Sequence, residues 1–181
     1  SRAVRAAQAT PALIASSRPE SSKTAARALG IAEAASDPGE LIAADIDVVH
    51  VCTPNATHAA YAAAALAAGK HVICEKPLAT SADEALALAT TARESGLVAA
   101  VPFVYRYHPQ VREMRARIAR GELGALLTLD CSYLQDWLLD AGDHAWRVDP
   151  ALGGSSRAFA DIGSHLCDLI ECVTGERIAG L

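Results

Sequence analysis

Aromatic residues and basic charge are both scarce in this 181-residue sequence. Aromatics make up 4% of the residues and hydrophobic residues 51%, so a core must be built mainly from Ala, Val, Leu and Ile. The formal net charge of −5 argues against a nucleic-acid partner. The alanine-rich runs are interrupted by charge and glycine, which excludes them as membrane spans. The opening SRAVRAAQAT lacks the apolar segment of a signal peptide.

Cysteine is present five times but without a CxxC pair or any metal-ligand spacing. We therefore expect no metal site. An odd, unpatterned set of cysteines favours reduced thiols and a cytoplasmic location. Cys52 and Cys74 stand in apolar, strand-like runs and are interpreted as small core residues.

Strand and helix signals alternate over residues 1–103, which predicts a Rossmann-like, doubly wound α/β fold with a parallel sheet. Strands are expected at 11–16, 46–52, 71–75 and 97–103. Helices are expected at 1–9, 19–30, 56–69 and from Ser81 to about 95. Gly30 and Gly69 fit C-caps, Asn55 fits an N-cap, and Ser81 with Glu84 has the spacing of a capping box.

The pattern changes in residues 104–181, which we interpret as the start of a second, α+β domain. A helix is expected at 108–120. The alternating segment ALLTLDCSYLQDW, residues 125–137, predicts a strand of a mainly antiparallel sheet with one covered face. A loop over 140–156 leads into AFADIGSHLCDLIECVTG.

Unusual residues follow two consecutive strands of the first domain. The turn TPN follows one strand, and Glu75, Lys76 and Pro77 follow the other. Ligands bind beyond the carboxyl ends of strands in doubly wound sheets, so these residues are expected to line one crevice. Lys76 is a candidate proton donor or acceptor, with its ammonium held by Glu75. The alternative is a surface lysine at a strand end.

Asp161 and His165 stand four residues apart in DIGSH. On a helix they share one face, where the carboxylate could orient the imidazole, and Asp168 extends that face. Together with Lys76 they form a set of groups that handle protons near neutral pH. The alternative is an N-terminal helix aspartate near an ordinary core or surface histidine.

Several motifs together resemble the glucose–fructose oxidoreductase/inositol dehydrogenase family, written Gfo/Idh/MocA. The most diagnostic stretch is VVHVCTPNATHAAYAAAALAAGKHVICEKPLA, at 48–79. It is followed, in the family's order, by YRYHP at 105–109, GELG at 121–124 and GGSSRAFADIGSHLCDL at 153–169.

This resemblance implies a nicotinamide-dependent dehydrogenase that acts on secondary alcohols of sugars, polyols or similar molecules. It implies that Lys76 holds or deprotonates the alcohol, that His165 accepts the proton and that Asp161 orients the substrate. The cofactor would lie over the strand ends, against Thr53, Pro54, Asn55, His58, Glu75, Lys76 and Pro77.

The family's opening strand and G-x-G-x-x-G turn are not found in the sequence. Its first residues resemble the helix that follows that turn. We therefore expect a chain without the first strand and phosphate loop, which ends before the sheet of the second domain is complete.

The cofactor is expected to be NADP rather than NAD. At the end of strand 11–16, where the family meets the adenosine ribose, stand Ser16, Ser17 and Arg18, with no acid before Glu20. An acid there would favour NAD, whereas hydroxyls and a guanidinium suit a 2′-phosphate. The alternative is a polar turn with a solvated arginine.

Tyr105, Arg106, Trp146 and Arg147 are the candidate substrate contacts. The first pair follows a strand end, and the second pair lies in the loop before GGSS. A tryptophan and an arginine suit stacking on, and hydrogen bonding to, a polyhydroxylated ligand. Alternatively, these side chains pack a domain interface.

Two other functions are also consistent with the sequence. One is a glycosidase- or lyase-like reaction in which bound NAD is used only transiently. The other is a non-catalytic binding relative, favoured by the missing glycine loop and opposed by the intact Lys76, Asp161 and His165. By analogy with the family, the protein is expected to be a homo-oligomer, a dimer or a tetramer, with a small-molecule partner and neither membrane nor nucleic acid.

Overall fold

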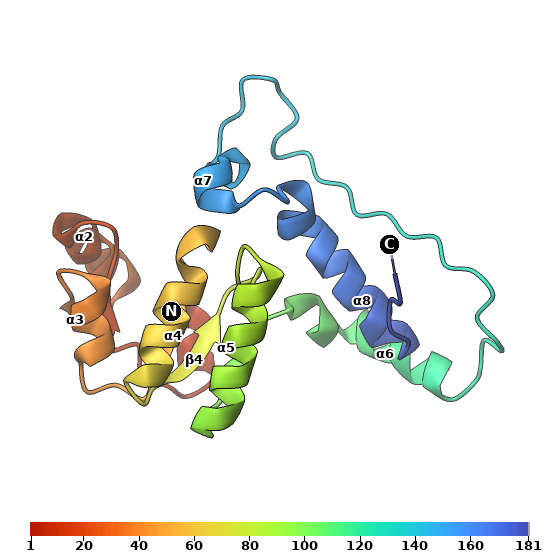
Figure 1. Ribbon diagram of the computed structural model, residues 1–181, viewed down its shortest axis with the longest axis horizontal. Coiled ribbons are helices and arrows are strands. Elements are labelled where there is room, and N and C mark those ends of the chain that lie inside the picture. Colours follow the sequence, from red (N-terminus) through yellow and green to blue (C-terminus); the bar gives the residue numbers. More distant parts are fainter. Residues whose placement is uncertain (181) are drawn as a thin grey trace. The chain divides into compact units, whose positions relative to one another are not determined.

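The computed structural model describes residues 1–180 (Figure 1). They fall into two compact units. The first unit consists of Ser1–Val51, Ala60–Ile73 and Leu88–Ala99. The second consists of Cys52–Ala59, Cys74–Ala87 and the chain from Ala100 onward.

The first unit begins with a small parallel sheet. Strand β1 (Leu13–Ile14) pairs with β2 (Glu33–Ala34), with Leu13 opposite Glu33. Helix α2 (Pro19–Leu29) connects them, α1 (Arg2–Ala6) precedes them and α3 (Pro38–Ala43) follows. Pro19 at the first helical position and Gly30 in the left-handed region, φ 61°, start and stop α2 as the sequence predicts.

A second sheet has the order β3-β4-β5, formed by Val48–Val51, His71–Cys74 and Ala99–Ala100. Helices α4 (His58–Ala67) and α5 (Ala82–Ser95) connect its strands, as crossovers between parallel strands require. The predicted Rossmann-like architecture is confirmed, but as two sheets rather than one. In the order 3-2-1-4-5-6 the first strand is central, and no strand within residues 1–180 takes that place.

Helix ends follow the sequence signals closely. Gly69 and Gly96 adopt φ of 73° and 68° just beyond α4 and α5, the conformation that glycine allows at a helix C-terminus. The Ser81 hydroxyl accepts a hydrogen bond from the Glu84 backbone N–H at 3.3 Å, so the predicted cap of α5 is confirmed. No helix in the part of the chain that the structure describes is long and apolar enough to cross a membrane.

The core is built from small and β-branched side chains, as the scarcity of aromatics predicts. On α4 the buried apolar residues are Ala62, Ala65 and Leu66, whose spacing places them on one helical face. Cys74 at the end of β4 is 1% exposed, and this burial raises the pKa of its thiol to about 12. Cys52 is exposed, so its predicted place in the core is wrong: it stands beyond Val51, the last residue of β3. All five cysteines are free thiols.

The second unit carries two longer helices. Helix α6 (Pro109–Ala119) packs against α8 (Ser164–Thr174), as Figure 1 shows. Short turns complete the unit: η1 (Asn55–Thr57), η2 (Val104–Tyr107), η3 (Trp146–Val148), α7 (Pro150–Gly153) and the π-helical turn η4 (Phe159–Gly163).

The antiparallel strand predicted for residues 125–137 is not formed. The segment has no regular structure and is drawn as a coil between α6 and α7 in Figure 1. Leu127 and Leu134 are 93% and 86% exposed. A strand needs a neighbour to complete its hydrogen-bond ladder, and none of the residues described here pairs with this segment.

Candidate functional site

The two strand ends singled out in the sequence meet through a buried histidine. His58 is 1% exposed, and its ring lies between two backbone carbonyls. Its Nδ1 is 2.7 Å from the Pro77 oxygen, and its Nε2 is 2.8 Å from the Thr53 oxygen. His58 therefore ties the turn after β3 to the segment after β4, and the expectation that these ends are neighbours is confirmed.

Asn55 is not the N-cap that the sequence predicts. A 3₁₀ turn, η1, precedes α4, and the cap position of that turn is Pro54. The Thr57 hydroxyl closes the turn by donating to the Pro54 carbonyl at 2.8 Å and contacts the Thr53 hydroxyl at 2.7 Å. Asn55 is thereby free to turn inward, where its Nδ2 donates to the Gly153 carbonyl at 2.9 Å.

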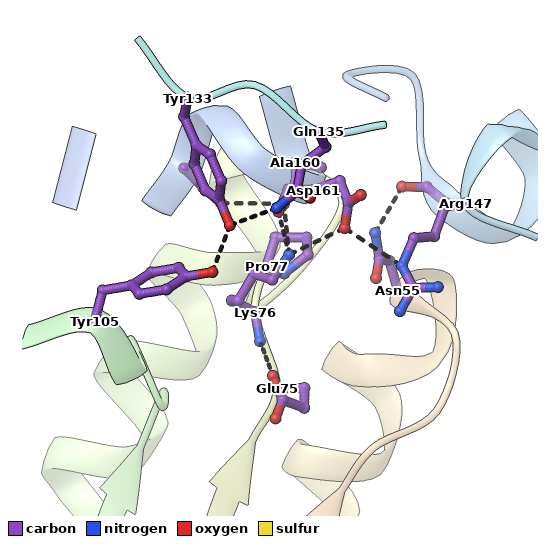
Figure 2. A network of polar contacts seen from close by, with 12 residues as sticks. Asn55, Glu75, Lys76, Pro77, Tyr105, Tyr133, Gln135, Arg147, Ala160 and Asp161 are labelled. Atoms are coloured by element: carbon purple, nitrogen blue, oxygen red, sulfur yellow. Dashed lines mark hydrogen bonds and ion pairs between the residues drawn. The ribbon is translucent and has the colours of Figure 1, made fainter. Parts of the chain in front are cut away.

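Lys76 belongs to the second unit, and its side chain is 14% exposed and directed towards Asp161 (Figure 2). Its Nζ donates to the Asp161 carbonyl and, at 3.4 Å, to that of Ala160. It also lies 3.3 Å from Asp161 Oδ1. The peptide bond from Lys76 to Pro77 is cis.

Glu75 does not hold this ammonium, so that part of the sequence interpretation is wrong. Its carboxylate accepts instead from the backbone N–H of Lys76 at 3.3 Å. Successive side chains of an extended chain point to opposite faces, which turns Glu75 away from the Lys76 ammonium. Asp161 is the carboxylate that pairs with it.

The expected pairing of Asp161 with His165 is also not observed. Residues 159–163 form a π-helical turn before α8, so the i, i+4 geometry of a regular α-helix does not apply across it. Asp161 Oδ1 lies 3.3 Å from both Lys76 Nζ and Arg147 Nε (Figure 2). Gly163 allows this turn, because a Cβ there would lie 2.7 Å from Cδ2 of Phe159.

Aromatic rings, rather than a carboxylate, surround His165. The rings of Tyr105 and Phe103 meet it edge-on, with centroids at 4.8 Å and 5.8 Å. The residue is 9% exposed, and its buried Nδ1 has no hydrogen-bond partner within the described part of the chain. Burial first, and then the positive charge of Lys76, lower the pKa of His165, which favours the neutral imidazole.

Two hydrogen-bonded tyrosines and a glutamine lie beside this histidine. The Tyr105 and Tyr133 hydroxyls share a hydrogen bond, and Gln135 Nε2 donates to the Tyr133 oxygen at 2.9 Å (Figure 2). The bond to Tyr133 raises the pKa of Tyr105. The tyrosine pair thus fixes ring positions next to the imidazole.

Arg147 stacks on the two tryptophans of the sequence. Its guanidinium carbon lies 4.5 Å from the ring centre of Trp146 and 5.7 Å from that of Trp137. Its Nε makes the contact with Asp161 described above. Arg147 therefore adds a second cation to the Asp161 carboxylate, opposite Lys76.

Arg106, a predicted substrate contact, is engaged within the protein. Its Nε donates to the Asp168 carboxylate at 2.8 Å and 2.9 Å, and its Nη2 contacts the same group. The Asp168 side chain is 7% exposed. This bidentate pair joins η2, which carries Tyr105, to α8, which carries His165.

Replacing Arg106 by alanine is expected to destabilise the protein by about 2 kcal/mol, because it leaves the buried carboxylate of Asp168 without its partner. Urea unfolding followed by circular dichroism measures the change. Arg117→Ala is the matched control, since its ion pair with Glu113 is exposed on both sides, at 57% and 54%, and should change little. Equal, small effects of the two substitutions would contradict a structural role for Arg106.

Lys76, Asp161, His165 and Arg147 line a cavity of about 280 Å³. Its lining comprises Lys76, Tyr133, Gln135, Trp137, Arg147, Asp161, Ile162 and His165. Tyr133, Gln135, Trp137 and Ile162 were missed in the sequence. The first three alternate within 125–137, so the period of two that indicates a strand also indicated that they share a side.

Ser16, Ser17 and Arg18 lie in the first unit, after β1. The Ser16 backbone N–H donates to the buried Ser22 hydroxyl at 2.9 Å, and Arg18 occupies the N-cap position of α2 without a side-chain cap. The Ser17 and Arg18 side chains are exposed. Within residues 1–180, no cluster of His, Cys, Asp and Glu could hold a metal ion.

Two family models match the chain. Residues 2–103 match an oxidoreductase family with an NAD-binding Rossmann fold, and residues 111–181 match the GFO/IDH/MocA C-terminal domain.

Several named relatives are dehydrogenases. Levoglucosan dehydrogenase of Pseudarthrobacter phenanthrenivorans is 39% identical over 91% of this chain and 42% of its own length. D-xylose 1-dehydrogenase (NADP(+)) 2 of Haloferax volcanii is 35% identical over 90% of this chain and 49% of its own. A solved levoglucosan dehydrogenase in complex with NADH and levoglucosan has a TM-score of 0.88 at 37% identity, covering 93% of this chain and 46% of that one. This chain thus spans less than half the length of each of the three.

Proposed function

Because this chain belongs to the Gfo/Idh/MocA family of oxidoreductases, we propose that it serves an NAD(P)-dependent oxidation or reduction. A hydride passes between a nicotinamide cofactor and a secondary alcohol of a sugar, a polyol or a similar small molecule. One observation carries the proposal: the Lys76 ammonium lines one cavity beyond the end of β4 together with the imidazole of His165, whose Nδ1 has no hydrogen-bond partner within residues 1–180. The names of the sugar dehydrogenases among the relatives support the substrate class.

Each polar side chain of the cavity has a separate task in alcohol oxidation. Lys76 donates a hydrogen bond to the reacting hydroxyl and stabilises negative charge on its oxygen. The lowered pKa of His165 favours the neutral imidazole, which can accept the hydroxyl proton as a general base. Asp161, fixed by Lys76 and Arg147, orients the substrate by accepting from its hydroxyls. In the reverse direction His165 returns the proton.

The strand ends fit a nicotinamide cofactor, which when bound exchanges the hydride. Thr53, Pro54, Glu75 and Pro77 would hold it, since ligands of doubly wound sheets bind beyond the strand ends. Lys76 would contact both cofactor and substrate. The polar atoms of His58 and the amide N–H of Asn55 are engaged within the protein, so these two residues act through the backbone that they fix.

NADP is the proposed form of the cofactor. Arg18 and the hydroxyls of Ser16 and Ser17 follow β1, where an acid would favour NAD. Replacing Arg18 by alanine should weaken NADPH binding about tenfold by removing a charged hydrogen bond to the 2′-phosphate. NADH affinity should not change. Titration of nucleotide fluorescence measures both, and an equal loss for the two nucleotides would contradict a 2′-phosphate contact.

Turnover with neutral sugars and polyols tests the reaction. The expected result is one NAD(P)H formed for each alcohol oxidised. Product formation without net NAD(P)H would instead establish the glycosidase- or lyase-like reaction with transiently used NAD. Saturable sugar binding with neither product nor NAD(P)H would establish a binding relative. Either of these results would overturn the proposed dehydrogenase.

Residues 1–103 form the nucleotide-binding domain, and residues 104–181 belong to the substrate and oligomerisation domain. A homo-oligomer, dimer or tetramer, is proposed by analogy with the family. Five free cysteines suit a reducing compartment, so a cytoplasmic location is proposed.

A further inference from the structure

Asn55 links two segments that lie 98 residues apart in the chain. It is 7% exposed, and its Nδ2 donates to the Gly153 carbonyl at 2.9 Å. Figure 2 shows its side chain directed towards the segment that carries Arg147. A buried amide held in this way is fixed in orientation, and loss of its partner would leave the Gly153 carbonyl unsatisfied.

The position of Gly153 in turn restrains the backbone of Arg147. The backbones of the two residues approach so closely that a Cβ on Gly153 would lie 2.5 Å from the Arg147 carbonyl oxygen and 3.2 Å from its Cα. Between them, the Asp149 carboxylate caps α7 by accepting from the Ala151 N–H at 2.9 Å. Residues 147–153 are thus a closed turn whose position depends on where Gly153 is held.

The other end of this turn reaches the cavity. Arg147 stacks on Trp146 and lies 3.3 Å from Asp161 through its Nε. We propose that Asn55 is a positioning residue: it fixes Gly153, and through the close approach of Gly153 to Arg147 it sets the Arg147 guanidinium against Asp161 and the two tryptophans. This inference rests on the proposed function only in taking the cavity as the substrate site.

A direct cofactor contact is the competing role for Asn55. The sequence places Asn55 next to two proposed cofactor residues, Thr53 and Pro54. Its bond to Gly153 uses an amide hydrogen, and its burial leaves little surface for a ligand. The two roles predict different losses. A positioning residue affects substrate binding through Arg147, whereas a cofactor contact affects nucleotide binding.

The two tryptophans make the proposal testable without turnover. Trp137 and Trp146 are the only tryptophans in the sequence, and both lie against Arg147. Tryptophan emission and its quenching by acrylamide therefore report on this cluster. Asn55→Ala should shift the emission to longer wavelength and increase quenching. Gly153→Ala should do the same from the other end of the link, since its Cβ would displace Arg147.

Gly142→Ala is the matched control. It lies in the same loop, its Cβ would meet nothing within 4 Å, and its emission should equal that of the wild type. In turnover assays both test variants should raise the substrate KM about fivefold to tenfold, as expected for a disturbed hydrogen-bonding group, with the nucleotide Kd unchanged. Thermal unfolding confirms that each variant is folded, and if Asn55→Ala does not fold, Gly153→Ala alone decides.

Unchanged tryptophan emission in the folded variants would overturn the positioning role. A tenfold higher nucleotide Kd for Asn55→Ala with unchanged substrate KM would assign Asn55 to the cofactor instead. These results are separate from the proposed reaction. If the variants shift the tryptophan emission but the wild-type protein forms no NAD(P)H, the positioning role is supported and only the proposed reaction is overturned.

Discussion

Lys76→Ala is expected to lower kcat/KM for alcohol oxidation by about 100- to 10,000-fold, the range for loss of a group that assists proton transfer. The ammonium is held by the Asp161 and Ala160 carbonyls, so its position is fixed before substrate binds. Alanine removes both the hydrogen bond to the reacting oxygen and the charge that stabilises it. Asp161 keeps Arg147 as a partner, so the variant should fold.

Steady-state kinetics on the purified protein measure this effect, with Lys23→Ala as the control. Lys23 is 58% exposed and, within residues 1–180, pairs only with the exposed Glu20, so its replacement should leave kcat/KM unchanged. A Lys76→Ala variant that is folded and active within about twofold of the wild type would contradict the assigned role. Unchanged sugar binding in such a variant would favour a binding relative.

Local signals in the sequence predicted most of the helix boundaries. Gly30, Gly69 and Gly96 follow helices in the left-handed conformation, and Ser81 caps α5. These features depend on contacts within one helical turn, which a sequence displays directly. The two short elements β2 and α3 were missed because neither carries a run of apolar residues long enough to show a period.

Long-range pairing could not be predicted in the same way. The alternation in residues 125–137 is a property of the segment, but a strand forms only where a neighbour completes its hydrogen bonds. The same holds for the division into two sheets, which depends on which strand takes the central place. Tyr133, Gln135 and Trp137 are nevertheless spaced two residues apart in this segment, and all three line the same cavity.

In the candidate site, too, the sequence predicted which residues take part but not which side chains they contact. Lys76, Asp161 and His165 line one cavity, although 85 residues separate the first two. Their partners were assigned incorrectly because the backbone sets direction. The extended chain turns Glu75 away from the Lys76 ammonium, and the π-helical turn removes the Asp161 carboxylate from His165. The π-helical turn is an irregular element that sequence spacing does not reveal, whereas the Glu75 assignment overlooked the regular alternation of side chains along an extended chain.

His165→Ala is expected to lower kcat/KM by about 100- to 10,000-fold through loss of the general base. The imidazole is enclosed by the rings of Phe103 and Tyr105, and its Nδ1 has no partner within residues 1–180. His108→Ala is the control, because His108 is exposed and makes no side-chain cap at the start of α6. Equal activity of the two variants would show that another group accepts the proton.

The pH dependence of kcat/KM gives the second test of the same residue. The neutral imidazole is the active form, so activity is lost as the pH falls through the pKa of His165. Burial and the Lys76 charge lower that pKa from its usual value of 6.5, so the acidic limb of the profile should lie below pH 6.5. The limb should be absent from the residual activity of His165→Ala.

Lys76→Met tests the electrostatic cause directly. Removing the positive charge removes one of the two causes that lower the pKa of His165, while the neighbouring carboxylates of Asp168 and Asp161 continue to raise it. The pKa in Lys76→Met should therefore be higher than in the wild type. Proton NMR titration measures it without turnover, with the His165 signal assigned by its loss in His165→Ala. Lys23→Met, whose charge is not among the causes of the shift, should leave the titration unchanged. An unchanged or lower pKa in Lys76→Met would contradict the coupling, and the neutral state of His165 would then follow from burial alone.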